Sequence, residues 1–332
     1  MCAKGMTVLY STKELQEVSR DASWASTSCE PMLSLDLREF DLTNSEVRRI
    51  NQWLYSLSLT KIAIADSTCP LLEGLDVIVE DESSMLSVVG CVQRNPLASG
   101  LLVQTTRITS QLPVKYGLVV ESLAYATLQG GEEFDRWLAE NKRQKKLDQV
   151  FECEPVKLVR QDNKLCIALA RRENRNALST EMRDALTDAF NLVALDDSIE
   201  QVFVSGEGPC FSAGGDLTEF GSCRDVAEAH QIRQLRMPAG YLAGNESKYT
   251  FQLHGACIGA GIELPAFASN VQASSDAYFR LPEVGMGLIP GAGGCVSIPR
   301  RIGRHRTNLL AILGENLSAE DALSWGLVDK IV

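Results

Sequence analysis

The sequence predicts an α/β fold in which short strands are joined by helical crossover connections. Strand patterns, glycine loops and helical patterns repeat in that order through the second half of the 332-residue chain. The first half also opens with a strand period, at residues 33–37, and a helix with the capping-box sequence Thr-Asn-Ser-Glu at 43–46 follows. We therefore divide the chain into a polar segment (1–32), an α/β region (33–150) and a second α/β region (151–332).

The first α/β region should contain further strands and then several helices. Apolar residues at helical spacing predict a helix over residues 45–58, and strand composition marks residues 62–65 and 75–79. Residues 86–94 are apolar and fit either type. Helical patterns follow at 96–108, at 118–128 and around Phe134 and Trp137, and the last ends in the basic run 142–146.

The second region has a more regular pattern. Residues 156–160 and 165–170 read as a hairpin, and Ser179 is placed to cap the helix that follows. A strand at 201–205 leads into the glycine-rich loop 206–215. Later elements are expected as a helix at 224–238, strands at 250–253 and 271–273, and a helical region at 290–313.

Composition excludes several classes of protein. A net charge of −11 argues against nucleic acid or an anionic membrane surface as the main partner. The ten cysteines form no C-x-x-C pair, so we expect reduced thiols and no structural zinc. No apolar run approaches the ~20 residues of a membrane span, and the start of the chain has no apolar signal core. We expect a cytoplasmic protein that holds no metal.

Three stretches combine glycine turns with isolated acidic residues. They are residues 211–217 (FSAGGDL), 254–264 (HGACIGAGIEL) and 279–294 (FRLPEVGMGLIPGAGG). Glycine lets the backbone approach a ligand closely, and it leaves N–H groups free to face a cavity. One such loop is explained by tight packing. Three in order, two of them with a lone glutamate (Glu263 and Glu283), indicate a site.

Together these stretches resemble the crotonase superfamily, also called the enoyl-CoA hydratase/isomerase family. The resemblance covers about residues 156–332 and includes Asn-Ala-Leu-Ser at 176–179, Ser-Ala-Gly-Gly-Asp at 212–216, residues 254–263, Pro-Glu at 282–283, Pro-Gly-Ala-Gly-Gly at 290–294 and the ending at 314–332. It implies the crotonase-like (ClpP/crotonase) spiral of ββα units, a coenzyme A thioester as substrate, no separate cofactor, and a homo-oligomer of three or six chains.

The resemblance also assigns roles to four residues. The N–H groups of Gly215 and Ala260 would form an oxyanion hole for the thioester carbonyl, although Ala260 stands where the family usually has glycine. Glu263 and Glu283 match the two acids of the hydratases and would share a water molecule as base and acid. Pro265 would remove a helical hydrogen bond near Glu263 unless it lies in the first turn.

Structural alternatives stay open for both glutamates. Glu263 could accept free N–H groups at a helix start, and Glu283 could pair with Arg280 or Arg300.

The resemblance places coenzyme A near one loop. Arg171, Arg172 and Arg175 would face its phosphates and the backbone at Ala213 its adenine, although a solvated loop would contain the same arginines.

The leading functional prediction is hydration of a 2-enoyl-CoA by Glu263 and Glu283. The alternatives are isomerisation, decarboxylation or thioester hydrolysis on the same scaffold, and a non-catalytic subunit that binds coenzyme A or a partner enzyme. The chain stops where the family continues into helices that cover the acyl pocket. Because residues 110–148 resemble those helices, we hypothesise that the first half is a divergent copy of the fold that supplies this cover.

Overall fold

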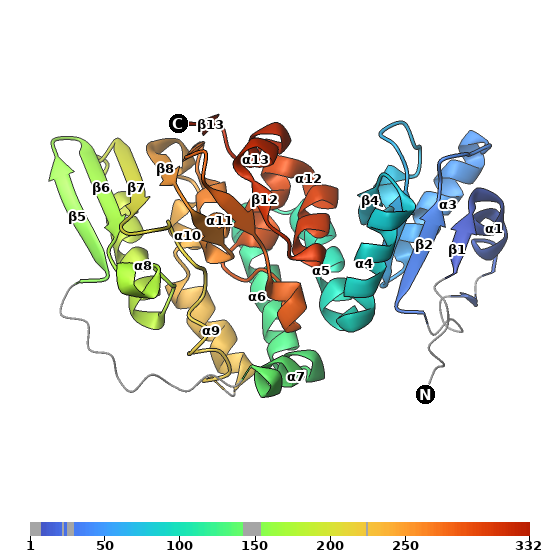
Figure 1. Cartoon of the computed structure of the whole chain (residues 1–332), viewed down its shortest axis with the longest axis horizontal. Coiled ribbons are helices and arrows are strands. Elements are labelled where there is room, and N and C mark those ends of the chain that lie inside the picture. Colours follow the sequence, from blue (N-terminus) through green and yellow to red (C-terminus); the bar gives the residue numbers. More distant parts are fainter. Residues whose placement is uncertain (1–7, 22, 25–29, 142–153, 224) are drawn as a thin grey trace.

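The computed structural model describes residues 8–21, 23–24, 30–141, 154–223 and 225–332. It confirms the α/β class, with a parallel sheet in the first half, two sheets in the second, and helices between them (Figure 1). The predicted basic run at 142–146 and the predicted boundary between residues 150 and 151 lie outside the described residues.

The N-terminal sheet is four-stranded and all parallel. Its strands, in spatial order, are β1 (Leu9–Ser11), β2 (Met32–Asp36), β3 (Thr60–Ile64) and β4 (Val77–Val79). Helices α1 (Thr12–Val18) and α3 (Asn44–Ser56) pack on one face. The predicted capping box is confirmed, since the Thr43 side chain accepts from the Glu46 N–H and the Glu46 carboxylate accepts from the Thr43 N–H.

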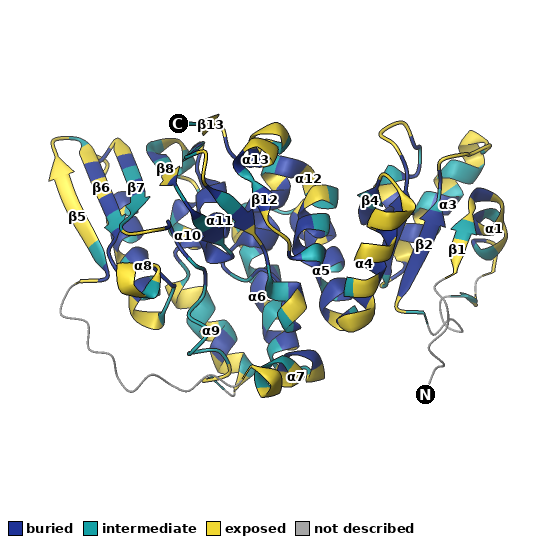
Figure 2. Ribbon diagram, in the orientation of Figure 1, coloured by how far each residue is buried: buried dark blue, intermediate teal, exposed yellow. Residues whose placement is uncertain are grey.

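Four helices connect this sheet to the second half. They are α4 (Glu82–Arg94), α5 (Pro96–Thr109), α6 (Val114–Gln129) and α7 (Glu132–Glu140). Residues of α4 and α5 cover the second face of the sheet, and the same apolar core continues into the C-terminal half. Figure 2 shows the resulting buried layer from β2 through α12. The segment at 86–94, whose type was open, is helical.

The second half contains a six-stranded sheet and a three-stranded sheet. The larger has the order β13 (Lys330–Ile331), β10 (Asn270–Ala273), β8 (Tyr249–Leu253), β7 (Gln201–Gly206), β6 (Lys164–Leu169) and β5 (Val156–Gln161). Among the described strands of this larger sheet, only the predicted hairpin β5–β6 is antiparallel. The smaller has the order β12 (Leu317–Ser318), β11 (Tyr278–Arg280) and β9 (Ala256–Ile258).

Helices fill the crossovers between these strands. They are α8 (Thr180–Leu195), α9 (Val226–Arg236), α10 (Ala239–Leu242), α11 (Ala260–Glu263), α12 (Gly294–Leu313) and α13 (Ala319–Trp325). Short 3-10 turns occur at η1 (Leu72–Gly74), η2 (Arg172–Asn174), η3 (Glu246–Lys248), η4 (Pro265–Phe267) and η5 (Glu283–Met286). Ser179 caps α8 as predicted, because its side chain accepts the Met182 N–H.

A buried carboxylate joins the N-terminal sheet to the helices of both halves. Asp76 is fully buried, and it pairs with Lys61 at 3.1 Å and with Arg107 of α5 at 2.8 Å. Burial lowers the pKa of Lys61 to about 8. From α12, the Asn308 side chain donates to the Asp76 carbonyl.

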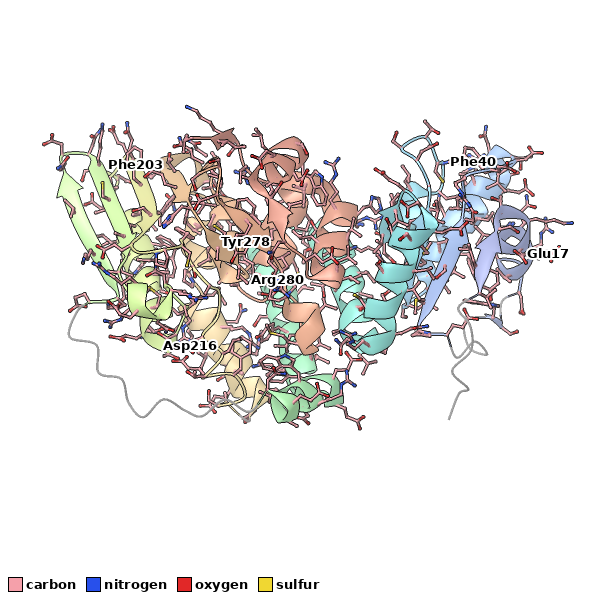
Figure 3. All side chains as sticks on the ribbon, in the orientation of Figure 1. Glu17, Phe40, Phe203, Asp216, Tyr278 and Arg280 are labelled. Carbon is pink, nitrogen blue, oxygen red and sulfur yellow. The ribbon has the colours of Figure 1, made fainter. Side chains whose placement is uncertain are left out.

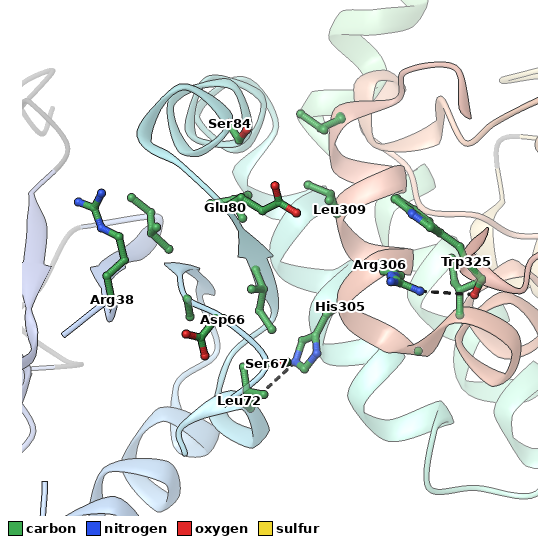
Figure 4. A pocket seen from close by; sticks show the side chains of 17 residues that line it. Arg38, Asp66, Ser67, Leu72, Glu80, Ser84, His305, Arg306, Leu309 and Trp325 are labelled. Atoms are coloured by element: carbon green, nitrogen blue, oxygen red, sulfur yellow. Dashed lines mark hydrogen bonds between the residues drawn. The ribbon is translucent and has the colours of Figure 1, made fainter. Parts of the chain in front are cut away.

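Beside this junction lies a cavity of about 900 Å³, where His305 contacts the Leu72 carbonyl (Figure 4).

We expect Asp76→Ala to lower the free energy of unfolding by about 3–5 kcal/mol, because two cations would stay buried without their shared partner. Urea denaturation measures the change. Asp36→Ala is the matched control, since Asp36 pairs with the half-exposed Arg38 and should change stability by less than about 1 kcal/mol. Equal small effects of both substitutions would contradict a structural role for the Asp76 cluster.

Candidate functional site

A cavity of about 320 Å³ brings the predicted residues together. Gly215, Ala260, Glu263 and Glu283 all line it. Residues of α6 and α7 also line it, namely Tyr125, Gln129 and Phe134. The first half therefore contributes directly to the wall of this cavity, while its descent from a copy of the fold stays a hypothesis.

The loop after β7 presents Gly215 to the cavity. The flanking residues are fixed, because Gly214 O accepts the Leu178 N–H at 2.7 Å and Asp216 N–H donates to Leu178 O at 3.2 Å. Ala260 is the first residue of α11, so its N–H has no acceptor within that helix. Among the hydrogen bonds of the described residues, neither the Gly215 nor the Ala260 N–H is used. Asp216, next to Gly215, is labelled in Figure 3.

Glu263 ends α11 and is buried. Its Oε2 accepts the N–H groups of Ala292 and Gly294 at 2.7 and 2.9 Å. The alternative role of Glu263, as an acceptor for free N–H groups at a helix start, is therefore partly correct, since its Oε2 accepts N–H groups at the start of α12. The carboxylate still lines the cavity. Pro265 opens the separate turn η4, and the Glu263 N–H keeps its bond to Gly259 O at 2.9 Å.

Glu283 begins η5 and approaches Glu263 across Gly259. A Cβ added at Gly259 would lie 2.5 Å from Oε1 of Glu283 and 3.6 Å from Oε1 of Glu263. Gly259 also has a φ of +50°, so both space and backbone require glycine there. The Glu283 Oε2 is buried without a hydrogen-bond partner among the described residues. The alternative pairing with Arg280 is not formed, since the Arg280 side chain donates to Gly314 O.

A third carboxylate, from the first half, completes the cluster. Glu121 of α6 is buried, and it accepts the N–H groups of Gly293 and Cys295 at 2.7 and 2.8 Å. Four successive N–H groups at the start of α12 are thus held alternately by Glu263 and Glu121. The sequence did contain a signal, because Glu121 lies on the apolar side of the predicted helix, in line with Leu118 and Tyr125.

Burial sets the electrostatics of the three acids. It raises the pKa of Glu263 to about 7, and the N–H groups of Ala292 and Gly294 oppose the rise. Burial, with the charge of Glu263 second, raises the pKa of Glu283 well above its usual range. The same two causes raise the pKa of Glu121. Near neutral pH the pair Glu263 and Glu283 can therefore hold one ionised and one protonated carboxyl group.

The residues predicted for coenzyme A lie outside this cavity. Arg171 is buried and pairs with Glu181 at 2.8 Å. Arg172 is exposed and lies 3.4 Å from Glu207, while Arg175 is exposed in the left-handed region at a φ of 51°. The Ala213 N–H donates to the Arg175 carbonyl at 2.9 Å. Contact of these four residues with coenzyme A stays a prediction.

Comparison with known proteins agrees with this geometry. The family model described as enoyl-CoA hydratase/isomerase matches residues 160–332, which is more than half of the chain. The chain belongs to this family. The crotonase-like fold predicted for the second half is accordingly confirmed. Within the described residues, no group of three or more His, Cys, Asp or Glu side chains is arranged to hold a metal ion.

Individual relatives of this family match the second half of the chain. The 2,3-dehydroadipyl-CoA hydratase of Escherichia coli is 31% identical over 172 residues, which are 52% of this chain and 67% of that protein. A probable enoyl-CoA hydratase of Bacillus subtilis is 34% identical over 163 residues, covering 46% of this chain and 60% of its own length.

Solved structures agree with these matches. Subunit I of the enoyl-CoA hydratase from Geobacillus kaustophilus aligns with a TM-score of 0.50 at 27% identity, covering 55% of this chain and 70% of that one.

No described helix is long and apolar enough to cross a membrane.

Proposed function

We propose that this protein adds water to the double bond of a 2-enoyl-CoA thioester. The observation that carries the proposal is the approach of the buried Glu263 and the partly buried Glu283 to one another at Gly259, in the cavity lined by Gly215 and Ala260. Family members that only move a double bond commonly retain one such acid. The presence of both favours hydration over isomerisation, decarboxylation and thioester hydrolysis.

In the proposed reaction the N–H groups of Gly215 and Ala260 bind the thioester oxygen. Each would stabilise the enolate-like negative charge that develops there by roughly 3–4 kcal/mol. A carboxylate accepts a proton from water as the water oxygen bonds to C3, and a carboxylic acid donates its proton to C2. The product is the 3-hydroxyacyl-CoA, and proton exchange with solvent resets the two groups.

The surroundings of the two acids favour one assignment. Glu263 accepts two N–H groups, which stabilise its ionised form, so we assign it as the base. Glu283 has a buried oxygen without a partner, so we assign it as the acid that keeps a proton near neutral pH. Coenzyme A would extend toward Arg172 and Arg175, because both are exposed while Arg171 is buried and paired with Glu181.

Product analysis with the purified 332-residue chain tests the reaction type. Crotonyl-CoA should yield 3-hydroxybutyryl-CoA, while a 3-enoyl-CoA and malonyl-CoA should turn over slowly or not at all. Faster conversion of either comparator would replace hydration by isomerisation or decarboxylation. Tight binding of all three thioesters without any turnover would instead indicate a non-catalytic subunit.

The pH dependence tests the assignment of the base. Because burial raises the pKa of Glu263 to about 7, its ionised form is scarce below that pH and prevails above it. We therefore expect kcat/KM for hydration to rise with pH through about 7, and to fall again only where Glu283 ionises. A profile that is flat from pH 5 to about 8 would contradict the assignment.

Two further expectations stay predictions. A homo-oligomer of three or six chains would be seen by sedimentation of the purified protein, and a cytoplasmic location by cell fractionation.

A further inference from the structure

A second cavity adjoins the one that holds the glutamates. It has a volume of about 560 Å³ and lies among α6, α9 and α10. Arg233, Met237 and Gly291 line both cavities, so these three residues form the wall between them. A group that extends from the reacting carbons beyond this wall would pass the Arg233 side chain.

Arg233 is a partly buried cation whose hydrogen-bond partners are neutral, and the Glu121 carboxylate acts on it from beyond ion-pair distance. Its guanidinium donates to the Ser122 hydroxyl at 3.1 Å and to Gln129 Oε1 at 2.8 Å, and it lies 4.6 Å from the centre of the Tyr125 ring. No carboxylate of the described residues lies within ion-pair distance of it. Burial lowers its pKa, which shows that the charge is held at a desolvation cost.

The charges around the second cavity favour an anion. Its cations are Arg233 and, on α6, the exposed Lys115. Glu121 is the one carboxylate among its described lining residues, and both Glu121 oxygens already accept backbone N–H groups. The whole chain has a net charge of −11, so this local excess of positive charge favours binding of an anionic ligand here.

We propose that Arg233 binds a carboxylate at the far end of the acyl chain, so that the substrate class is the coenzyme A monothioester of a dicarboxylic acid. The inference rests on the proposed function, since the thioester must lie at Gly215 and Ala260 for the distal end to reach α9. The two cavities then hold one acyl chain, with Lys115 at the outer end. An anionic group of coenzyme A itself is the alternative ligand for Arg233.

Two saturated thioesters of equal chain length separate these possibilities. Adipyl-CoA and hexanoyl-CoA differ only in the terminal carboxylate, and their binding can be measured by calorimetry without any turnover. We expect the 332-residue chain to bind adipyl-CoA roughly 10- to 100-fold more tightly than hexanoyl-CoA, as a charge-assisted hydrogen bond allows. Equal affinity for the two thioesters would overturn the proposal without using any variant.

Substitution of the cation identifies the residue responsible. Arg233→Met should remove the preference by weakening adipyl-CoA binding and leaving hexanoyl-CoA binding within about threefold. Arg236→Met is the matched control, because Arg236 lies on the same helix, is half exposed, pairs with Asp188 at 3.7 Å and lines neither cavity. Equal weakening of both thioesters by Arg233→Met would assign Arg233 to coenzyme A and overturn the proposal.

A second variant, at an exposed position, tests the proposal in case Arg233→Met does not fold. Lys115 is exposed, so Lys115→Met leaves the core intact and should reduce adipyl-CoA binding alone. Preferential binding of adipyl-CoA, without hydration of crotonyl-CoA or of the 2-enoyl form of adipyl-CoA, would contradict the proposed hydration and support the carboxylate site. If neither saturated thioester binds, both proposals fail.

Discussion

Glu283→Gln should lower kcat for hydration of crotonyl-CoA by roughly 10²- to 10⁴-fold, because the amide cannot deliver a proton to C2. The substitution preserves the size of the side chain beside Gly259, so KM should change little. Initial rates of 3-hydroxybutyryl-CoA formation measure the effect. Glu320→Gln, at an exposed position in the first turn of α13, is the control and should keep full activity.

A Glu283→Gln variant that retained more than a tenth of the activity would show that another group donates the proton. Glu263→Gln should cause a loss of similar size. In that variant the rising limb of the pH profile near pH 7 should also disappear, since the group responsible for it is gone.

The second large effect concerns Glu121, which connects the first half of the chain to the site. Glu121→Leu would leave the buried N–H groups of Gly293 and Cys295 without acceptors. We expect the free energy of unfolding to fall by about 3 kcal/mol or more. We also expect kcat to fall, because the same backbone segment holds Glu263. Urea denaturation and initial rates, measured where the variant is folded, report the two effects.

Glu133 offers a matched control. It is also buried on a helix of the first half, and it also accepts two backbone N–H groups, those of Leu97 and Ala98 at the start of α5. Glu133→Leu should therefore lower stability by a similar amount and leave kcat of the folded protein nearly unchanged. Equal losses of kcat in the two variants would mean that Glu121 acts on the site only through general stability.

The site residues that could be predicted from the sequence are those whose immediate neighbours in the chain mark them as unusual. Glu263 and Glu283 stand out because each is an isolated acid within a run of small and apolar residues. Glu121 did not stand out as a site residue, because its partners lie more than 170 residues later in the chain. An acid on the apolar side of a helix signals a buried partner, but only the fold shows which backbone it meets.

Prediction of the fold was limited in the same way, because burial depends on partners that are distant in the sequence. The alternation at residues 33–37 predicts one buried face, yet Ser34 on the other face is buried as well, because α4 and α5 of the same chain cover it. The strands β9 and β11 were not predicted, since each has three residues and gains its definition from pairing with the other. Local patterns give the type of an element, while its exposure depends on long-range packing.

The first half shares its core and the wall of the candidate site with the second half. One apolar core runs from the N-terminal sheet through α4 and α5 to α12, and α6 and α7 line the cavity. Removal of residues 1–145 should therefore leave the remaining chain insoluble or inactive.

Hydration in water enriched in heavy oxygen tests the central claim most directly. Mass spectrometry of the product from crotonyl-CoA should show one heavy oxygen at C3 of 3-hydroxybutyryl-CoA, formed by the wild type and lost in both Glu263→Gln and Glu283→Gln. Unlabelled product, a shifted double bond, or undiminished labelling in the two variants would contradict the assignment of these glutamates as the acid and base of a hydratase.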